Sequence, residues 1–223
     1  MAPKLVIFDC DGVLVDSELI ASRQLAAFLT ELGRSTTALE CRNTFTGMSI
    51  KSVGEHVHHN WGLTLPTNFV EQLRLRDYEA FATELTAIAG IEAVLDELKT
   101  NRIPFCVASS GTPEKIHHSL AITGLLNHFN GHVFSAVQVT HGKPAPDLFE
   151  LAAYEMKARP QDCIVVEDAP PGVQGGVAAG MTVLGFCGGS HCTNNTPKAL
   201  SDAGAQDIAM KMAEVSDFLL NSV

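Results

Sequence analysis

The sequence is short of positive charge. Its 223 residues include 15 Lys and Arg against 25 Asp and Glu, which gives a formal net charge of −10 at pH 7 with His neutral. An acidic surface repels phosphate backbones, so this composition argues against a nucleic-acid-binding protein. An anionic small molecule would also be repelled unless its binding site carried local positive charge.

Long hydrophobic runs are missing as well. No apolar run approaches the roughly 20 residues that a membrane-spanning helix needs. The first apolar segment, LVIF, is too short for a secretory signal peptide, and acidic residues follow it at once. We therefore expect a cytoplasmic protein with no membrane partner. We also expect a monomer, because the sequence suggests no exposed apolar seam.

Cysteine pairs of the CxxC type are absent. The six cysteines are scattered along the chain, and we expect all of them to be reduced thiols. The nearest approach to a metal-binding cluster is CGGSHC, which holds Cys187, His191 and Cys192. No second ligand pair with the spacing of a structural zinc site accompanies it, which argues against a zinc site there.

Short apolar runs of strand length are present and recur along the chain. They alternate with segments of helical periodicity, one of which begins at Pro113 after the N-cap residue Thr112 and another at Pro146. This alternation predicts an α/β fold with a doubly wound, Rossmann-like parallel sheet. The runs predicted to form strands are KLVIF, IPFCVAS, HVFSAV, CIVVED and TVLGFC.

Residues 17–86 break this alternation. They contain no β-branched run and read as helices, the first of which is predicted to end at Gly33. We therefore predict a catalytic core made of residues 1–16 and 87–223, with residues 17–86 inserted as a small helical domain.

Polar residues follow several of the predicted strands. Ligands of parallel sheets bind at the carboxyl ends of the strands, so we expect these side chains to meet. Acids on separate loops suit Mg²⁺, whereas a lysine and a hydroxyl at the start of a helix suit phosphate oxygens. The residues are Asp9 and Asp11 after the first strand, Ser109 and Ser110 after IPFCVA, Lys143 after VQVTHG, which is also read as a strand end, and Glu167 and Asp168 after CIVV.

Four ordered segments resemble the motifs of the haloacid dehalogenase superfamily of phosphohydrolases: DCDGVLVDSE, VASSG, GKPAPD and VVEDAPPGV. The resemblance covers essentially the whole chain. It implies an Mg²⁺-dependent phosphatase that acts on a small phosphorylated metabolite through an aspartyl-phosphate. It also implies that residues 17–86 are a mobile cap.

The resemblance assigns a role to each motif residue. Asp9 would be the nucleophile. Asp11 would protonate the leaving alkoxide, activate the hydrolytic water and ligate Mg²⁺ through its main-chain carbonyl. Ser109 and the N–H group of Ser110 would hold the phosphate, and Lys143 would balance negative charge. The metal ligands would be Asp9, Asp11, Glu167 and Asp168.

The residues at a few positions indicate which branch of the superfamily the sequence resembles most. Asp11 favours phosphate esters, because the dehalogenase and phosphonatase branches lack an aspartate there. The β-phosphoglucomutase group carries a histidine and an arginine where this sequence has Ala21 and Ile50, which weakens a mutase interpretation. FDCDGVLVDSELIASR, EKIHHSL and GFCGGSH resemble bacterial phosphatases of 6-phosphogluconate and related sugar phosphates. A phosphomutase, a phosphoglycolate or nucleotide phosphatase and a non-catalytic phosphometabolite-binding protein stay open.

The segment FTGMSIK resembles the cap loop that faces the active site in this superfamily. It implies substrate contacts from Thr46, Gly47, Ser49 and Lys51. Lys51 would suit the carboxylate of a sugar acid. The alternative is that Lys51 is a solvated residue on a helix.

Overall fold

The central sheet consists of six parallel strands in the order β3-β2-β1-β4-β5-β6. The computed structural model describes residues 3–46 and 48–221 of the chain. The strands are β1 (Leu5–Phe8), β2 (Phe105–Ser109), β3 (Val133–Ser135), β4 (Cys163–Glu167), β5 (Thr182–Phe186) and β6 (Asp207–Ala209). The predicted α/β fold is confirmed, and so are the five predicted strands. The sequence analysis missed β6, because it has three residues and lies at an exposed edge.

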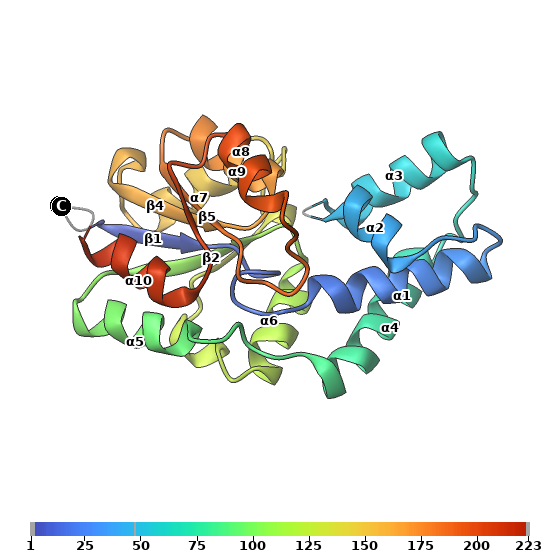
Figure 1. Cartoon of the computed structure of the whole chain (residues 1–223), viewed down its shortest axis with the longest axis horizontal. Helices are drawn as coiled ribbons and strands as arrows, with labels where there is room; N and C mark the ends of the chain where they lie inside the picture. The colour runs from blue at the N-terminus through green and yellow to red at the C-terminus, as the bar shows by residue number, and fades with distance from the viewer. Residues whose placement is uncertain (1–2, 47, 222–223) are drawn as a thin grey trace.

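Helices cover both faces of the sheet (Figure 1). Side chains alternate along β1, so Val6 and Phe8 enter one apolar cluster, whereas Leu5 and Ile7 enter the other. The helices α5 (Ile91–Thr100), α6 (Pro113–Ile122) and α10 (Met212–Asn221) pack on the first face. The helices α7 (Asp147–Glu155), α8 (Pro170–Ala178) and α9 (Thr196–Ala203) pack on the second. Burial on both faces explains why the central strands read as continuous apolar runs.

Two predicted boundaries are corrected. Helix α7 begins at Asp147, because Pro146 takes the N-cap position. The segment VQVTHG is not a strand: β3 ends at Ser135, and a short 3₁₀ helix, η2 (Ala136–Gln138), follows. The Ser135 hydroxyl accepts from the Val137 N–H group, and the Gln138 side chain accepts from the Ser135 N–H group, so the backbone turns away from the sheet. Lys143 therefore lies in a loop.

The described residues of the segment 18–84 form four helices beside the carboxyl edge of the sheet (Figure 1). They are α1 (Glu18–Glu31), α2 (Ala38–Phe45), α3 (Ile50–Trp61) and α4 (Phe69–Glu84). Helix α1 ends at Glu31, two residues before the predicted Gly33. These helices share an apolar cluster of their own, which includes Leu29 and Leu73. The base of α1 and the end of α4 belong to the main core through Ile20 and Phe81. The domain limits at 17 and 86 stay a prediction.

In the described ranges, 3–46 and 48–221, no helix is both long enough and apolar enough to cross a membrane.

Candidate active site

A buried lysine joins two carboxylates at the carboxyl edge of the sheet. Asp9 continues β1, since its N–H group donates to the Val166 carbonyl at 3.0 Å, and its side chain is buried. Lys143 Nζ lies 2.5 Å from Asp9 Oδ1 and 2.5 Å from Glu167 Oε1. It also donates to the Ala108 carbonyl at 2.9 Å. The structure thus brings Lys143 to the predicted place, although from a loop instead of a strand end.

Burial governs the electrostatics of this group. It raises the pKa values of Asp9 and Glu167, with Lys143 opposing the shift and Asp168 adding to it. Burial also disfavours the charged form of Lys143, but its two carboxylate partners hold its pKa above the ordinary value. Lys143 therefore stays cationic, whereas the acids around it, once all are ionised, would carry more negative charge than one lysine can balance.

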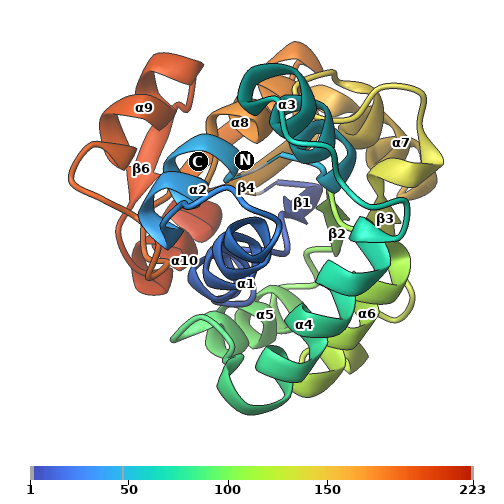
Figure 2. The same cartoon turned by 90° about the vertical axis from the view of Figure 1, so that its right-hand side faces the viewer.

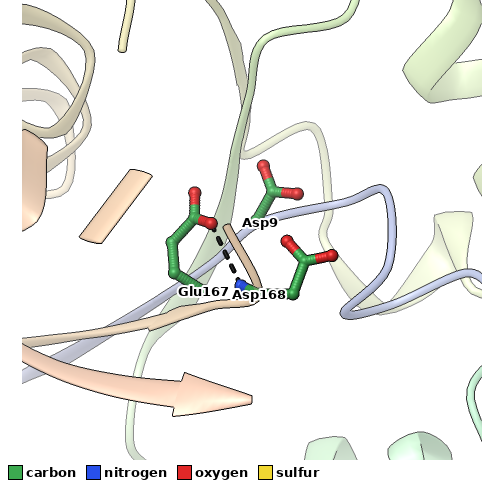
Figure 3. Close-up of side chains that lie close together, drawn as sticks. All are labelled: Asp9, Glu167 and Asp168. Atoms are coloured by element: carbon green, nitrogen blue, oxygen red, sulfur yellow. Dashed lines mark hydrogen bonds between the residues drawn. The ribbon is translucent and has the colours of Figure 1, made fainter. Parts of the chain in front are cut away.

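Asp9, Glu167 and Asp168 turn their carboxylates toward a common space (Figure 3). One oxygen from each lies within 4.8 Å of the others, and all three residues are buried. An oxygen-only donor set with excess negative charge fits a hard divalent cation. The Asp11 side chain is not part of this set; its predicted contribution is through its carbonyl oxygen and stays a prediction.

The chain fixes the Glu167 carboxylate from two sides. The N–H groups of Asp168 and Ala169 donate to Glu167 Oε2 at 3.1 and 3.3 Å. On the other side the carboxylate lies against Gly172 in the first turn of α8, where an added Cβ would come within 1.9 Å of Glu167 Oε1. Only glycine allows this approach of helix and carboxylate.

Asp11 faces a different set of partners. Ser17 Oγ donates to Asp11 Oδ1 at 2.5 Å, and Lys115 Nζ donates to Asp11 Oδ2 at 2.9 Å. Although burial opposes ionisation, Lys115 and Ser17 together lower the pKa of Asp11. The sequence analysis missed Lys115. Its signal was its place in the first turn of α6, directly after the serine turn.

The serine turn is held by hydrogen bonds of its own. Ser109 is buried, and its hydroxyl accepts from the Gly111 N–H group at 3.1 Å. Ser135 Oγ donates to the Gly111 carbonyl at 2.6 Å, which ties the turn to β3. Thr112 caps α6 as predicted, accepting from the Lys115 N–H group. Ser109 and Ser110 line the same cavity as Asp9 and Lys143.

That cavity has a volume of about 590 Å³ and lies between the sheet edge and helices α1–α4. Thr46, Ser49 and Lys51 line it as predicted, whereas Gly47 lies outside the described residues. Their polar groups have local partners: the Thr46 hydroxyl donates to the Arg42 carbonyl, and the Ser49 hydroxyl caps α3. Lys51 is 86% exposed and lies 3.9 Å from Glu55 on its own helix. Their contact with a substrate stays a prediction.

A histidine that the sequence analysis did not place here reaches the acidic group. His191 Nε2 lies 2.9 Å from Asp168 Oδ2, and both side chains are buried. Burial opposes protonation, but the contact with Asp168 raises the pKa of His191 to about 11. Within the described part of the chain, the acidic group is the one cluster of three or more His, Cys, Asp or Glu side chains that could hold a metal. His191 of the segment CGGSHC thus contacts an acid of the site, and all six cysteines are free.

Known proteins share both the sequence and the fold. The model of the haloacid dehalogenase-like hydrolase family matches residues 3–180. The chain is 35% identical over 187 residues to the 6-phosphogluconate phosphatase of Escherichia coli K12, covering 83% of each chain. It is 33% identical over 196 residues to hexitol phosphatase A of the same organism, covering 82% of this chain and 83% of that one.

A solved structure agrees over the full length. It is a haloacid dehalogenase family hydrolase of Deinococcus radiodurans R1 with bound phosphate and sodium. The TM-score is 0.80 at 31% identity, and the match covers 100% of this chain and 97% of that one. The motifs, the fold and the family model agree, and the chain belongs to the haloacid dehalogenase-like hydrolase family.

Proposed function

We propose that this protein is an Mg²⁺-dependent phosphatase that hydrolyses a small sugar phosphate or sugar-acid phosphate through an aspartyl-phosphate intermediate. One observation carries the proposal: the buried carboxylate of Asp9 lies 2.5 Å from Lys143 and shares a metal-capable space with Glu167 and Asp168. Without such cations, a carboxylate could not approach an anionic phosphate.

In the first step, an Asp9 oxygen attacks phosphorus and the bond between phosphorus and the ester oxygen breaks. The leaving alkoxide takes a proton from Asp11. In the second step, water attacks the phosphorus of the aspartyl-phosphate, and its proton goes to Asp11. The Asp9 carboxylate and inorganic phosphate are released. Ser109, Ser110 and Lys143 hold the phosphate oxygens in both steps.

Asp11 must serve as acid and then as base. Its contacts with Lys115 and Ser17 keep it ionised, which suits the second step. For the first step it must leave Lys115 and face the ester oxygen with a proton. A substrate bound between the sheet edge and α1–α4 would bring about this change.

Asp9, Glu167 and Asp168 would hold the magnesium ion, with the Asp11 carbonyl completing the protein ligands. When bound, the ion would neutralise charge between the phosphate and the carboxylates. We further propose that residues 17–86 act as a cap that excludes water and recognises the organic part of the substrate.

The relatives support a polyhydroxylated substrate, since two of them are named for 6-phosphogluconate and for hexitol phosphates. The cavity favours hydrolysis over a mutase reaction. Ala21 and Ile50, which replace the histidine and arginine of the mutase group, both line it. Neither side chain can transfer a proton or pair with a second phosphate.

The test is phosphate release from a panel of phosphate esters in Mg²⁺, measured beside Asp9→Asn. The panel holds 6-phosphogluconate, hexitol and hexose 6-phosphates, β-glucose 1-phosphate, phosphoglycolate and nucleotides. We expect release from the sugar and sugar-acid esters that depends on Asp9. Isomerisation of β-glucose 1-phosphate without release, or tight binding without turnover, would contradict the proposal. Release confined to phosphoglycolate or nucleotides would contradict the substrate class.

A further inference from the structure

A buried acid in α4 is left unexplained by the proposed chemistry. Asp77 is 9% exposed, and its Oδ1 atom has no hydrogen-bond partner. Burial raises its pKa to about 7, with Lys115 opposing the shift and Asp11 adding to it. A buried carboxylate oxygen without a partner is costly to the fold. A bound molecule that donates hydrogen bonds to it would remove that cost.

Asp77 lies where the helices α1–α4 join the main core. Along α4 it is one turn from Leu73, which belongs to the cluster of α1–α4, and one turn from Phe81, which belongs to the main core. Helix α4 runs beside α6 (Figure 2), and the Tyr78 ring stacks on the His118 ring between them. Asp77 therefore lies between the helices α1–α4 and the main core, and it lines the 590 Å³ cavity.

The neighbours of Asp77 place it on the leaving-group side of the site. Lys115 projects from α6 and binds Asp11, the residue assigned to the ester oxygen. The charges of Lys115 and Asp11 both act on Asp77. Asp77 thus shares the cavity with Lys115 and Asp11 and lies close enough to feel their charges, on the side where the organic part of the substrate would extend beyond the ester oxygen. Next to Asp77, Tyr78 also lines the cavity, and its buried hydroxyl has no hydrogen-bond partner.

We propose that Asp77 is a specificity-determining residue that accepts hydrogen bonds from the substrate hydroxyls nearest the phosphate ester. This inference rests on the proposed function and deepens it. Donors of hydrogen bonds favour the ionised form of Asp77, and an ionised carboxylate accepts hydrogen bonds only, so hydroxyl groups suit it, whereas the carboxylate of a sugar acid has no proton to donate. The substrate must therefore carry hydroxyls beside the ester and any acidic group at its far end.

The experiment compares two substrates on Asp77→Asn. One is whichever of glucitol 6-phosphate and 6-phosphogluconate the wild type hydrolyses better; the other is phenyl phosphate, which has no hydroxyl groups. We expect kcat/KM for the polyol ester to fall at least about tenfold, mainly through KM, as a lost charged hydrogen bond implies. For phenyl phosphate we expect a fall of less than about threefold, because no hydroxyl is there to lose. The melting temperature should not fall, because the buried Oδ1 atom of Asp77 has no hydrogen bond to lose.

Glu79→Gln is the matched control, since it removes an exposed charge from the same helix outside the cavity. It should leave both substrates unchanged. A measurement on the wild type alone avoids any folding defect: 5-deoxyglucitol 6-phosphate, which lacks the hydroxyl nearest the ester, should lose a similar factor. On Asp77→Asn, the deoxy and parent esters should then react alike.

Equal losses on polyol and phenyl esters would overturn the proposal, because Asp77 would then act on Lys115 and Asp11 and not on the substrate. No loss on either ester, or a wild type indifferent to the missing hydroxyl, would overturn it too, while the phosphatase assignment would stand. A wild type that releases phosphate from no ester would overturn both.

Discussion

The two walls of the cavity are built in different ways. At the sheet edge the charged groups meet across long stretches of chain: Lys143 is 134 residues from Asp9, and Lys115 is 104 residues from Asp11. In α2 and α3 the polar groups are satisfied within a few residues, as with Ser49 and Ser52 or Lys51 and Glu55. Long-range pairs are fixed by the whole fold, whereas local pairs can be exchanged without disturbing it. The sheet edge therefore suits the groups that react. Helices α2 and α3 suit residues that determine which substrate binds.

The largest effect is expected from Asp9→Asn. An amide oxygen cannot form the acyl-phosphate, so phosphate release should fall at least about a thousandfold, consistent with loss of a covalent nucleophile. Circular dichroism should show an intact fold. A variant with near wild-type turnover would mean that the sheet edge is not where the phosphoryl group is transferred.

Lys143→Met tests the buried network through stability. It leaves Asp9 and Glu167 without their shared cation, so the free energy of unfolding should fall by about 3–5 kcal/mol. Urea denaturation measures this change. Lys51→Met is the matched variant on the other wall; Lys51 is largely exposed, so its effect should stay within about 0.5 kcal/mol. Equal losses of unfolding free energy in the two variants would contradict the distinction between a long-range network at the sheet edge and local pairs in α2 and α3.

His191→Gln should weaken metal binding without removing a ligand. His191 Nε2 touches Asp168, and loss of such an outer contact typically lowers metal affinity about 10–100-fold. Mn²⁺ affinity measured by electron paramagnetic resonance is independent of turnover. Mn²⁺ binding as tight as in the wild type would show that Asp168 needs no such support.

Excess chelator should stop phosphate release in the wild type, and full activity in chelator would contradict the metal assignment.

The smallest effect is expected from Lys51→Gln. Because Lys51 is exposed and pairs only weakly with Glu55, the KM for 6-phosphogluconate should rise no more than about threefold. The KM for a hexitol phosphate should stay unchanged. A much larger, acid-specific rise would mean that Lys51 reaches the substrate carboxylate when the cavity is filled.

Much of the fold and part of the site followed from the sequence. Apolar runs marked five strands, and the polar residues after them marked the positions of Asp9, Ser109 and Glu167, because parallel strands end at one edge. Lys143 reaches Asp9 from a loop and not from the end of a strand, since VQVTHG looks like a strand until the Ser135 cap turns the chain. The three-residue strand β6 carries too little pattern to be found.

The long-range partners of other site residues had no local signal. The local sequence pattern indicates only a helix or a loop around Lys115, Asp77 and His191. It does not indicate which distant residues these side chains contact. Their meaning comes from contacts with Asp11, with the cavity and with Asp168, and only the folded chain makes these. Long-range pairing of this kind is what periodicity and spacing cannot predict.

Trapping the phosphoryl group on Asp9 tests the proposed aspartyl-phosphate intermediate directly. The protein is mixed with a hydrolysable sugar phosphate and Mg²⁺ and quenched in acid within one turnover. It is then digested, and the mass of the peptide that contains Asp9 is measured by mass spectrometry. We expect the added mass of one phosphoryl group on Asp9, and none in Asp9→Asn. A wild type that releases phosphate while Asp9 never carries the group would contradict the account.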